Sequence, residues 1–446
     1  VSMGSLVGST NSCDGLEVRS FGPLGGSDVF VARVDGCQDA ATASVRWVSQ
    51  VGGTDADRAT AMAVGSDGSI YVAGTTRSND LPSRRPWIQG RFAAASPLVS
   101  VGDAFLVRLT SDGELTACTY LGREGDEVIR SMFVEDDGSL VVCGHTTSQV
   151  FQTTEGAFQR EFRSASVLVP DGFLARIEPD LSRFRWSTLY GGQSADWFLC
   201  VRPRPGGGYV CGGWHASVDL PMPDGREATE LNGLRDAFVV EFTRDGSSLL
   251  DVWSFGGAGF DQVTDLVVHS EVESGAGRIF VTGWTNDGQS FPSSVGEPGR
   301  SREQFSDEAF VAELGAEGEL LRSRVFGGAA EDHPKSVCID RTVEGRPELI
   351  LVGDSRSDRF PGNGKGLLGP VAVQGFVLGF DLGLESTELG ERFRFARMSR
   401  PRCVQSTADG LVIAGWAVGL RTNRLVQLGA APGSDSVEGF LLGFAR

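Results

Sequence analysis

One short motif recurs seven times along this chain, and the recurrence constrains the fold more than any other feature. Each copy places an acidic residue or Gln two positions before a Phe, and a run of mostly apolar residues follows. The seven Phe residues stand 64 to 75 residues apart. They are Phe30, Phe105, Phe173, Phe238, Phe310, Phe376 and Phe440. A period of this length predicts a repeat architecture with one structural unit per copy.

Each unit reads as four short strands. After most copies of the motif, a Gly turn leads to a second strand that ends in Gly-Gly, as at 184–192 and 250–257. An acidic residue follows five positions after the first Gly of the pair and opens a third strand. The fourth strand is rich in β-branched and small residues, as at 70–74 and 140–144. Short strands, Gly turns and no long helical periodicity predict an all-β fold.

Seven four-stranded units favour a β-propeller, whose blades surround a channel and leave only short, protected sheet edges. We expect one seven-bladed propeller domain over residues 1–446. Its approximate blades are 1–51, 57–121, 127–190, 196–255, 261–326, 332–395 and 401–446. A linear solenoid is the weaker alternative, because it needs capping repeats with a polar outer face and neither end of the sequence has one.

These residues resemble the bacterial SBBP repeat, a seven-bladed β-propeller repeat family. Its unit is similar to Asp-Ala-Phe, then Tyr-Leu-Gly-Gly, then Asp-Gly-x-Ile-Tyr-Val-x-Gly and Phe-Pro. Matching stretches begin at Tyr120, Tyr190, Asp67, Leu81, Leu220, Phe291 and Phe360. The resemblance implies a seven-bladed propeller, usually in secreted or surface-attached proteins, and no catalytic residue set. Arg123 replaces the second Gly of one pair, and the stretch 396–401 lacks both the Gly pair and the acid.

The two ends of the chain suggest incomplete first and last blades. Residues 1–10 align with 64–75 with a two-residue gap, so the sequence begins at the end of an innermost strand. The first blade then lacks its innermost strand and the last blade its outermost one. We expect an upstream segment of about 25 residues, judged by repeat length, to supply both strands in the native protein. The alternatives are a partner chain or a propeller that is open at this point.

Long connections gather on one predicted face. The connections from the small-residue strand to the Phe strand run about 20 to 28 residues, for example over 75–102 and 145–170, whereas the other turns are short. Long loops on one face are where binding residues concentrate. The turns that carry the repeated acids open on the same side, which we call the loop face.

The repeated acids and a set of aromatic residues are candidate binding residues on the loop face. The acids are Asp57, Glu127, Asp196, Asp261 and Asp332. Converging carboxylates would bind Ca²⁺, but we favour a structural role in which each caps backbone N–H groups of a tight turn, with no cofactor. The second set is His145, Trp214, Trp284 and Trp416. These rings would stack on sugars or anchor a peptide, or else pack between blades.

The eight Cys residues lack the paired spacing of a zinc site. Sequence proximity makes two disulfides plausible, Cys13 with Cys37 and Cys200 with Cys211. Free buried thiols are the equal alternative.

Composition excludes some partners. The formal net charge of −18 would repel nucleic acid and anionic membranes, and no apolar stretch is long enough to span a membrane. Catalysis has little support, because there are four His residues in all and no Gly-x-Ser-x-Gly or phosphate-binding Gly loop.

We therefore expect a non-catalytic structural or protein-interaction propeller. It would be exported from a bacterium to the periplasm, cell surface or medium, and would bind another protein or a surface polymer through the loop face. A carbohydrate- or cation-binding module is the second interpretation. A hydrolase or lyase with its site over the channel is the third.

Overall fold

The structure is a computed structural model of the chain. It describes residues 2–7, 17–35, 44–94, 102–164, 166, 168–227, 230–270, 277–294, 306–315, 319–341, 346–357, 360, 373–393, 398–407, 410–418, 426–428 and 437–445.

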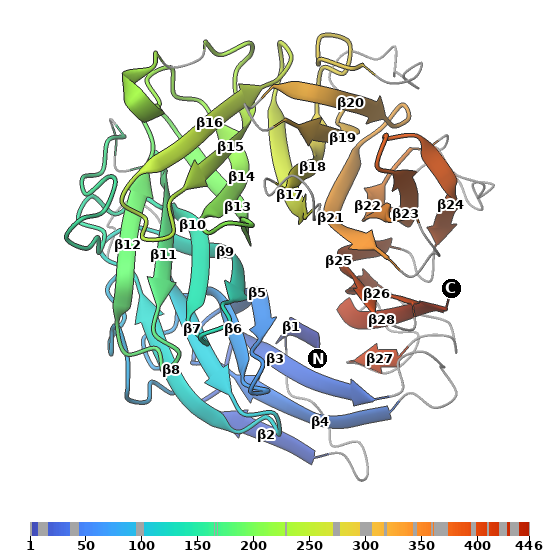
Figure 1. Cartoon of the computed structure of the whole chain (residues 1–446). Coiled ribbons are helices and arrows are strands. Elements are labelled where there is room, and N and C mark those ends of the chain that lie inside the picture. The colour runs from blue at the N-terminus through green and yellow to red at the C-terminus, as the bar shows by residue number, and fades with distance from the viewer. Residues whose placement is uncertain are drawn as a thin grey trace.

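The described strands form seven four-stranded sheets, and these surround a central opening (Figure 1). The fold is a β-propeller. In five sheets the strands follow chain order and neighbours are antiparallel. The first two of these contain β5 (Asp57–Val64), β6 (Ile70–Thr76), β7 (Asp103–Leu109) and β8 (Leu115–Leu121), then β9 (Glu127–Val134), β10 (Leu140–Thr146), β11 (Asp171–Ile177) and β12 (Phe184–Tyr190).

The next three sheets repeat this order. They contain β13 (Asp196–Pro203), β14 (Tyr209–His215), β15 (Asp236–Phe242) and β16 (Leu249–Phe255); β17 (Asp261–His269), β18 (Arg278–Thr285), β19 (Glu308–Leu314) and β20 (Leu320–Phe326); and β21 (Asp332–Asp340), β22 (Glu348–Ser355), β23 (Gln374–Asp381) and β24 (Ser386–Phe393). The Phe-motif strands β11, β15 and β19 are buried along their whole length. Their near-continuous apolar sequence reflects burial on both faces of the sheet.

The first and last sheets depart from the pattern. The first contains β1 (Ser2–Val7), β2 (Glu17–Phe21), β3 (Ser27–Asp35) and β4 (Ser44–Val51), and β2 lies at its outer edge, parallel to β4. The last contains β25 (Met398–Thr407), β26 (Gly410–Val418), β27 (Val426–Leu428) and β28 (Val437–Ala445), and β27 pairs with β28 in the outer position. We did not expect either β2 or β27 from the sequence, because each comes from a connection without the repeat motif.

The predicted alignment of the N-terminal segment is wrong. Gly4 of β1 pairs with Phe30, as Gly74 of β6 pairs with Phe105. The alignment of residues 1–10 with 64–75 had instead matched Gly4 with a position in 67–69. β1 is therefore the strand that neighbours the Phe strand, and it contacts both β5 and β28, so the first and last described strands lie side by side (Figure 1).

The inner strands line the opening and bond to one another through side chains. Thr264 Oγ1 of β17 donates a hydrogen bond to the carbonyl oxygen of Pro334 in β21 (3.0 Å). Val404 N of β25 donates to Ser336 Oγ of β21 (3.4 Å), and Val201 N of β13 donates to Ser131 Oγ of β9 (3.4 Å). An exposed sheet edge is thus partly satisfied by the neighbouring inner strand.

The core lies between neighbouring sheets. One cluster joins Leu106 of β7 to Phe173 of β11, and equivalent clusters join the other neighbours. The Tyr before the Gly pair ties a long connection to this core: Tyr120 Oη accepts from Leu81 N (2.8 Å) and donates to the carbonyl oxygen of Ser78 (3.0 Å). The repeated Leu-Pro stretches are therefore held where the loop face begins.

The predicted Cys200–Cys211 disulfide is wrong. Both thiols are free and buried. Cys200 pairs with Gly212 and Cys211 with Val201, so the two side chains enter different core clusters. A bulge in β13 produces this offset. Cys13 and Cys37 lie outside the described residues.

The described residues contain one helix, the short 3₁₀ turn at Pro223–Gly225. Within the same residues, no helix has the length and apolar character needed to cross a bilayer.

Candidate functional site

The five repeated acids cap the turns that join neighbouring sheets. Gly192 N donates to Asp196 Oδ2 (2.8 Å), and Ser217 Oγ donates to the same oxygen (2.7 Å). Asp332 repeats this arrangement with Gly328 N (2.7 Å) and Ser357 Oγ (2.8 Å). The acids thus hold tight turns to the ends of the strands beside them, as the structural interpretation predicted.

All five carboxyl groups are shielded from solvent. Asp57, Glu127, Asp196, Asp261 and Asp332 each have an exposed fraction of 0%. Burial raises the pKa of Glu127, Asp196 and Asp261 to about 7 and that of Asp332 to about 6, and it also raises the pKa of Asp57. These groups do not present carboxylates to a ligand on the loop face.

Each junction holds a second buried acid that the sequence analysis did not single out. The first residue of the Phe motif lies beside the same Gly pair: a Cβ atom on Gly122 would meet both Glu127 and Asp103. Asp103 accepts from Ala93 N and Ala94 N (2.8 Å each), so it anchors a long connection. The recurrence of this residue at the start of the Phe motif is the sequence feature that could have identified it.

Among the described residues, no three His, Cys, Asp or Glu side chains are grouped as they would be to hold a metal ion.

The aromatic candidates lie together on the loop face and include residues that the sequence analysis missed. The His145 ring stacks on Trp197 with centroids 3.7 Å apart, and Trp197 lies 5.2 Å from Trp214. The Arg235 guanidinium lies over Trp214 at 4.7 Å and over Trp284 at 5.1 Å. Trp416 lies in β26, but its side chain is outside the described residues. The Arg235 guanidinium also lies over Phe260 at 4.9 Å. We call His145, Trp197, Trp214, Arg235, Phe260 and Trp284 the aromatic cluster.

Most ring faces in this cluster are covered. Arg130 lies 5.1 Å from the centroid of Trp197, whose ring also carries His145. Burial lowers the pKa of His145, so this ring packs as a neutral group. Trp197 and Arg235 come from strand ends of one sheet, whereas His145 and Trp284 come from the sheets on either side, and only the fold brings them together.

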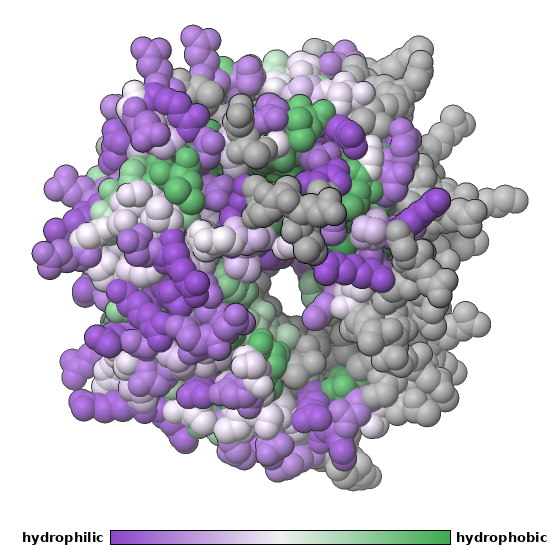
Figure 2. Space-filling model, viewed as in Figure 1, coloured by the Kyte–Doolittle hydropathy of each residue, from purple (hydrophilic) through white to green (hydrophobic). Residues whose placement is uncertain are grey.

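A group of cations on the inner strands borders the opening, and the sequence analysis did not predict it. Arg58 of β5, Arg130 of β9, Lys335 of β21, and Arg400 and Arg402 of β25 all belong to inner strands. We call these five residues the basic cluster. Figure 2 shows that the opening passes through the molecule, so these strands border a channel.

The cations of the basic cluster influence one another electrostatically. Burial, followed by the positive charge of Arg58, lowers the pKa of Arg130 to about 10. Burial also lowers the pKa of Lys335 to about 8. The negative charge of Asp354 opposes this shift, whereas the positive charges of Arg402 and Arg400 add to it. Loss of contact with water lowers the pKa of Arg402; the charge of Asp354 acts against this shift, and the charges of Arg58 and Arg400 add to it.

Few anions oppose these charges. Asp354 lies 3.8 Å from Lys335 Nζ and 4.0 Å from Arg400 Nε. In the described parts of the chain, no carboxylate forms an ion pair with Arg58, Arg130 or Arg402, and Arg130 Nε is buried without a hydrogen-bond partner. Positive charge therefore concentrates at the channel of a protein whose formal charge is −18.

Comparison with known proteins identifies the repeat. The β-propeller repeat family SBBP matches residues 46–82. The chain carries an SBBP repeat. The matched residues span most of β4, all of β5 and β6, and Leu81-Pro82. The resemblance noted in the sequence is thereby confirmed.

The chain also resembles a curated protein in part. It is 26% identical over 208 residues to the regulatory protein FlaEY of Caulobacter vibrioides; the match covers 46% of this chain and spans 20% of that protein's length.

Among solved structures, a quinohemoprotein alcohol dehydrogenase from Comamonas testosteroni is 11% identical, with coverage of 86% of this chain and 75% of that one and a TM-score of 0.39. A puromycin hydrolase is 11% identical, with coverage of 83% and 51% and a TM-score of 0.34.

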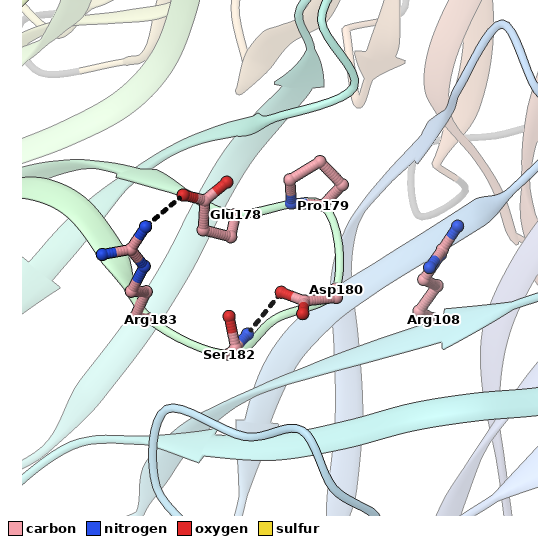
Figure 3. A pocket seen from close by; sticks show the side chains of 6 residues that line it. All are labelled: Arg108, Glu178, Pro179, Asp180, Ser182 and Arg183. Atoms are coloured by element: carbon pink, nitrogen blue, oxygen red, sulfur yellow. Dashed lines mark hydrogen bonds and ion pairs between the residues drawn. The ribbon is translucent and has the colours of Figure 1, made fainter.

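The face opposite the loop face carries a pocket of about 390 Å³ (Figure 3). It lies beside the turn between β11 and β12. Its charged groups are engaged with one another: Arg183 pairs with Glu178 (3.1 Å), and Asp180 accepts from Ser182 N (3.0 Å). The pocket thus offers fewer unpaired charges than the channel.

Proposed function

We propose that this chain is a non-catalytic interaction propeller of an exported or surface-associated bacterial protein, which binds another protein or a surface polymer through its loop face. In this proposal residues 1–446 are one closed domain of seven blades. The blades provide a rigid frame, and the connections between them provide the contact surface.

The distribution of exposed apolar side chains carries the proposal. Eight large apolar residues of the described chain are exposed. Five of them lie in loop-face connections or turns: Val150, Leu168, Val218, Leu234 and Phe260. Exposed apolar groups concentrated on one side are typical of a protein contact surface. The aromatic cluster beside them adds Trp and Arg, the residue types most enriched where binding energy is concentrated.

The use of the histidines supports a binding role over hydrolysis. His215 has both ring nitrogens engaged, with the carbonyl oxygen of Ser217 (3.0 Å) and with Ser254 Oγ (2.7 Å). His333 Nε2 pairs with Asp307 (2.6 Å). No described Ser, Thr or Cys side chain bonds to His333, whereas a nucleophile must lie within hydrogen-bond reach of its base.

The other binding interpretations have less support. Sugar recognition needs a free aromatic face, and the faces of Trp197, Trp214 and Trp284 are largely occupied by His145 and Arg residues. A calcium site needs converging oxygens, and the five repeated acids are engaged in turns. A protein partner, bound through exposed Val, Leu, Phe and Arg, is the interpretation that we favour.

Site-specific photo-cross-linking in the producing cells tests the proposal. In one variant a photoreactive amino acid replaces Val218, which is 69% exposed on the loop face. In the control variant it replaces Val64, which is 51% exposed and ends β5 on the opposite face. We expect one discrete adduct from position 218 and none from position 64. Equal adducts from both positions, or none from position 218, would refute the proposal.

A further inference from the structure

The strongest unassigned feature is the basic cluster at the channel. Its members come from four sheets and from positions up to 344 residues apart, since Arg58 and Arg402 both belong to it. Like charges that face one another across a channel repel, and this repulsion lowers stability unless an anion offsets it. Asp354 offsets part of the charge at Lys335, Arg400 and Arg402, and Asp126 and Asp307 offset part of it at Arg130 and Lys335.

The three remaining arginines lack described ion-pair partners. Arg58 and Arg402 are exposed residues of the inner strands β5 and β25, and Arg130 has a buried Nε with no acceptor. A buried donor without an acceptor costs free energy, which a bound acceptor would recover. Guanidinium groups match carboxylates with two parallel hydrogen bonds.

We propose that the channel mouth is an anion-binding site that takes an acidic segment of the partner protein. This inference rests on the proposed function and names the chemistry of its partner. Carboxylate side chains of the segment pair with Arg58, Arg130 and Arg402, while apolar residues beside them contact the exposed side chains of the loop face.

A peptide fits these observations better than an acidic polysaccharide. Arg130 and His145 cover Trp197, so the ring nearest the cations offers little face for a sugar to stack on. The protein as a whole is strongly acidic and repels an extended polyanion, whereas a short segment reaches only the positive channel. Opposite charge on a small, partly enclosed site also directs the approach of the partner.

Isothermal titration with hexaglutamate at low salt tests the inference, with galacturonate hexamer and inorganic phosphate as comparison ligands. We expect wild-type protein to bind hexaglutamate more tightly than either. The double variant Arg58→Gln/Arg402→Gln should lose at least about tenfold in affinity, because it removes charge-assisted hydrogen bonds to carboxylates. Arg58→Lys/Arg402→Lys should retain most of it.

The matched control variant also removes two positive charges from the loop face, but at residues that do not belong to the basic cluster. Arg77 and Arg123 are exposed beside the turn residues, so Arg77→Gln/Arg123→Gln should bind hexaglutamate as wild type does. Circular dichroism verifies that each variant is folded. Absence of wild-type binding, equal loss in both Gln variants, no loss in Arg58→Gln/Arg402→Gln, or tighter binding of galacturonate hexamer would each overturn the inference.

The two experiments together distinguish failure of the channel site from failure of the proposed function. If cross-linking from position 218 persists in the Arg58→Gln/Arg402→Gln variant while hexaglutamate does not bind to wild type, the partner uses the loop face without the channel. The proposed function then stands and only the acidic segment is refuted.

Discussion

Gly74 lies opposite Phe105 in the pairing of β6 and β7, and a Cβ atom on Gly74 would collide with the backbone carbonyl oxygen of Arg58. The same collision would occur at Gly144, Gly213, Gly283 and Gly353, each opposite a motif Phe. A bulge in the inner strand of each sheet brings this carbonyl close. The recurring Gly in the small-residue strand is therefore a consequence of this close approach.

Gly74→Ala should destabilise the protein severely. The added methyl group displaces backbone atoms, and we expect the free energy of unfolding to fall by about 3 kcal/mol or more. Gly156→Ala is the control: its site has open space but a φ of +81°, which costs a side chain about 1–2 kcal/mol. Urea denaturation measures both. A smaller loss for Gly74→Ala than for Gly156→Ala would contradict the structure.

Asp196→Ala should weaken one junction between sheets. The substitution leaves Gly192 N–H and Ser217 Oγ without their shared acceptor, and each unsatisfied buried donor costs about 1–3 kcal/mol. At pH 5, the free energy of unfolding of the Asp196→Ala variant should be about 2 kcal/mol lower than that of wild type. Asp196→Asn keeps an acceptor oxygen and should lose less; an unchanged stability of the Ala variant would argue against the capping role.

Calcium should not stabilise the protein through the repeated acids. Because Asp57, Glu127 and their equivalents already accept hydrogen bonds from turns, we expect the same melting temperature in excess Ca²⁺ and in chelator. An ion bound to the folded state alone would raise this temperature. A calcium-dependent rise that Asp196→Asn abolished would instead establish the cation site.

Stability should fall as pH rises from 5 to 8. Burial raises the pKa of Asp28 and Asp103 to about 6 and that of Glu127, Asp196 and Asp261 to about 7, whereas these groups titrate near 4 when unfolded. The folded state therefore binds more protons in this window, and its stability is lost as pH rises toward the folded pKa values.

Two buried histidines act in the opposite sense. Burial lowers the pKa of His145 and His215, which favours the folded state as pH rises through the value of an unfolded His, but the raised carboxyl groups outnumber them. Guanidinium denaturation at pH 5, 6.5 and 8 measures the balance. Asp196→Asn should reduce the slope, and stability that increases steadily with pH would contradict the assignment.

Cys200 and Cys211 should remain thiols in protein purified without reductant. Peptide mapping should find both unmodified when native protein is treated with iodoacetamide and both alkylated after denaturation, because both are buried. A peptide linking the two residues would show that the register of β13 and β14 is wrong.

The repeat made most of the sheets predictable. The spacing from each Gly pair to its acid, as from Gly191 to Asp196, located the turns at five junctions, and the Phe motif located one buried strand of each sheet. Prediction failed where the motif is weak: β2 and β27 pair at outer edges without a repeat signal, and the N-terminal segment was aligned in the wrong register on its small residues. One bulge was enough to separate Cys200 from Cys211, because a shift of one residue exchanges the faces of a strand.

The candidate site was only partly visible in the sequence. Trp214 and Trp284 stood out by their repeat position, but Arg235 between them did not. Arg58, Lys335 and Arg402 are separated by several blades in sequence, and only the circular arrangement brings their charges to one channel.

Hydrogen exchange of the full chain with and without hexaglutamate tests the central claim most directly. We predict slower exchange in peptides covering 53–60, 122–131 and 398–404, which contain the channel arginines, and no change at the opposite-face turns 64–70, 110–114 and 135–139. Protection of those turns, or no protection at the channel, would contradict the account.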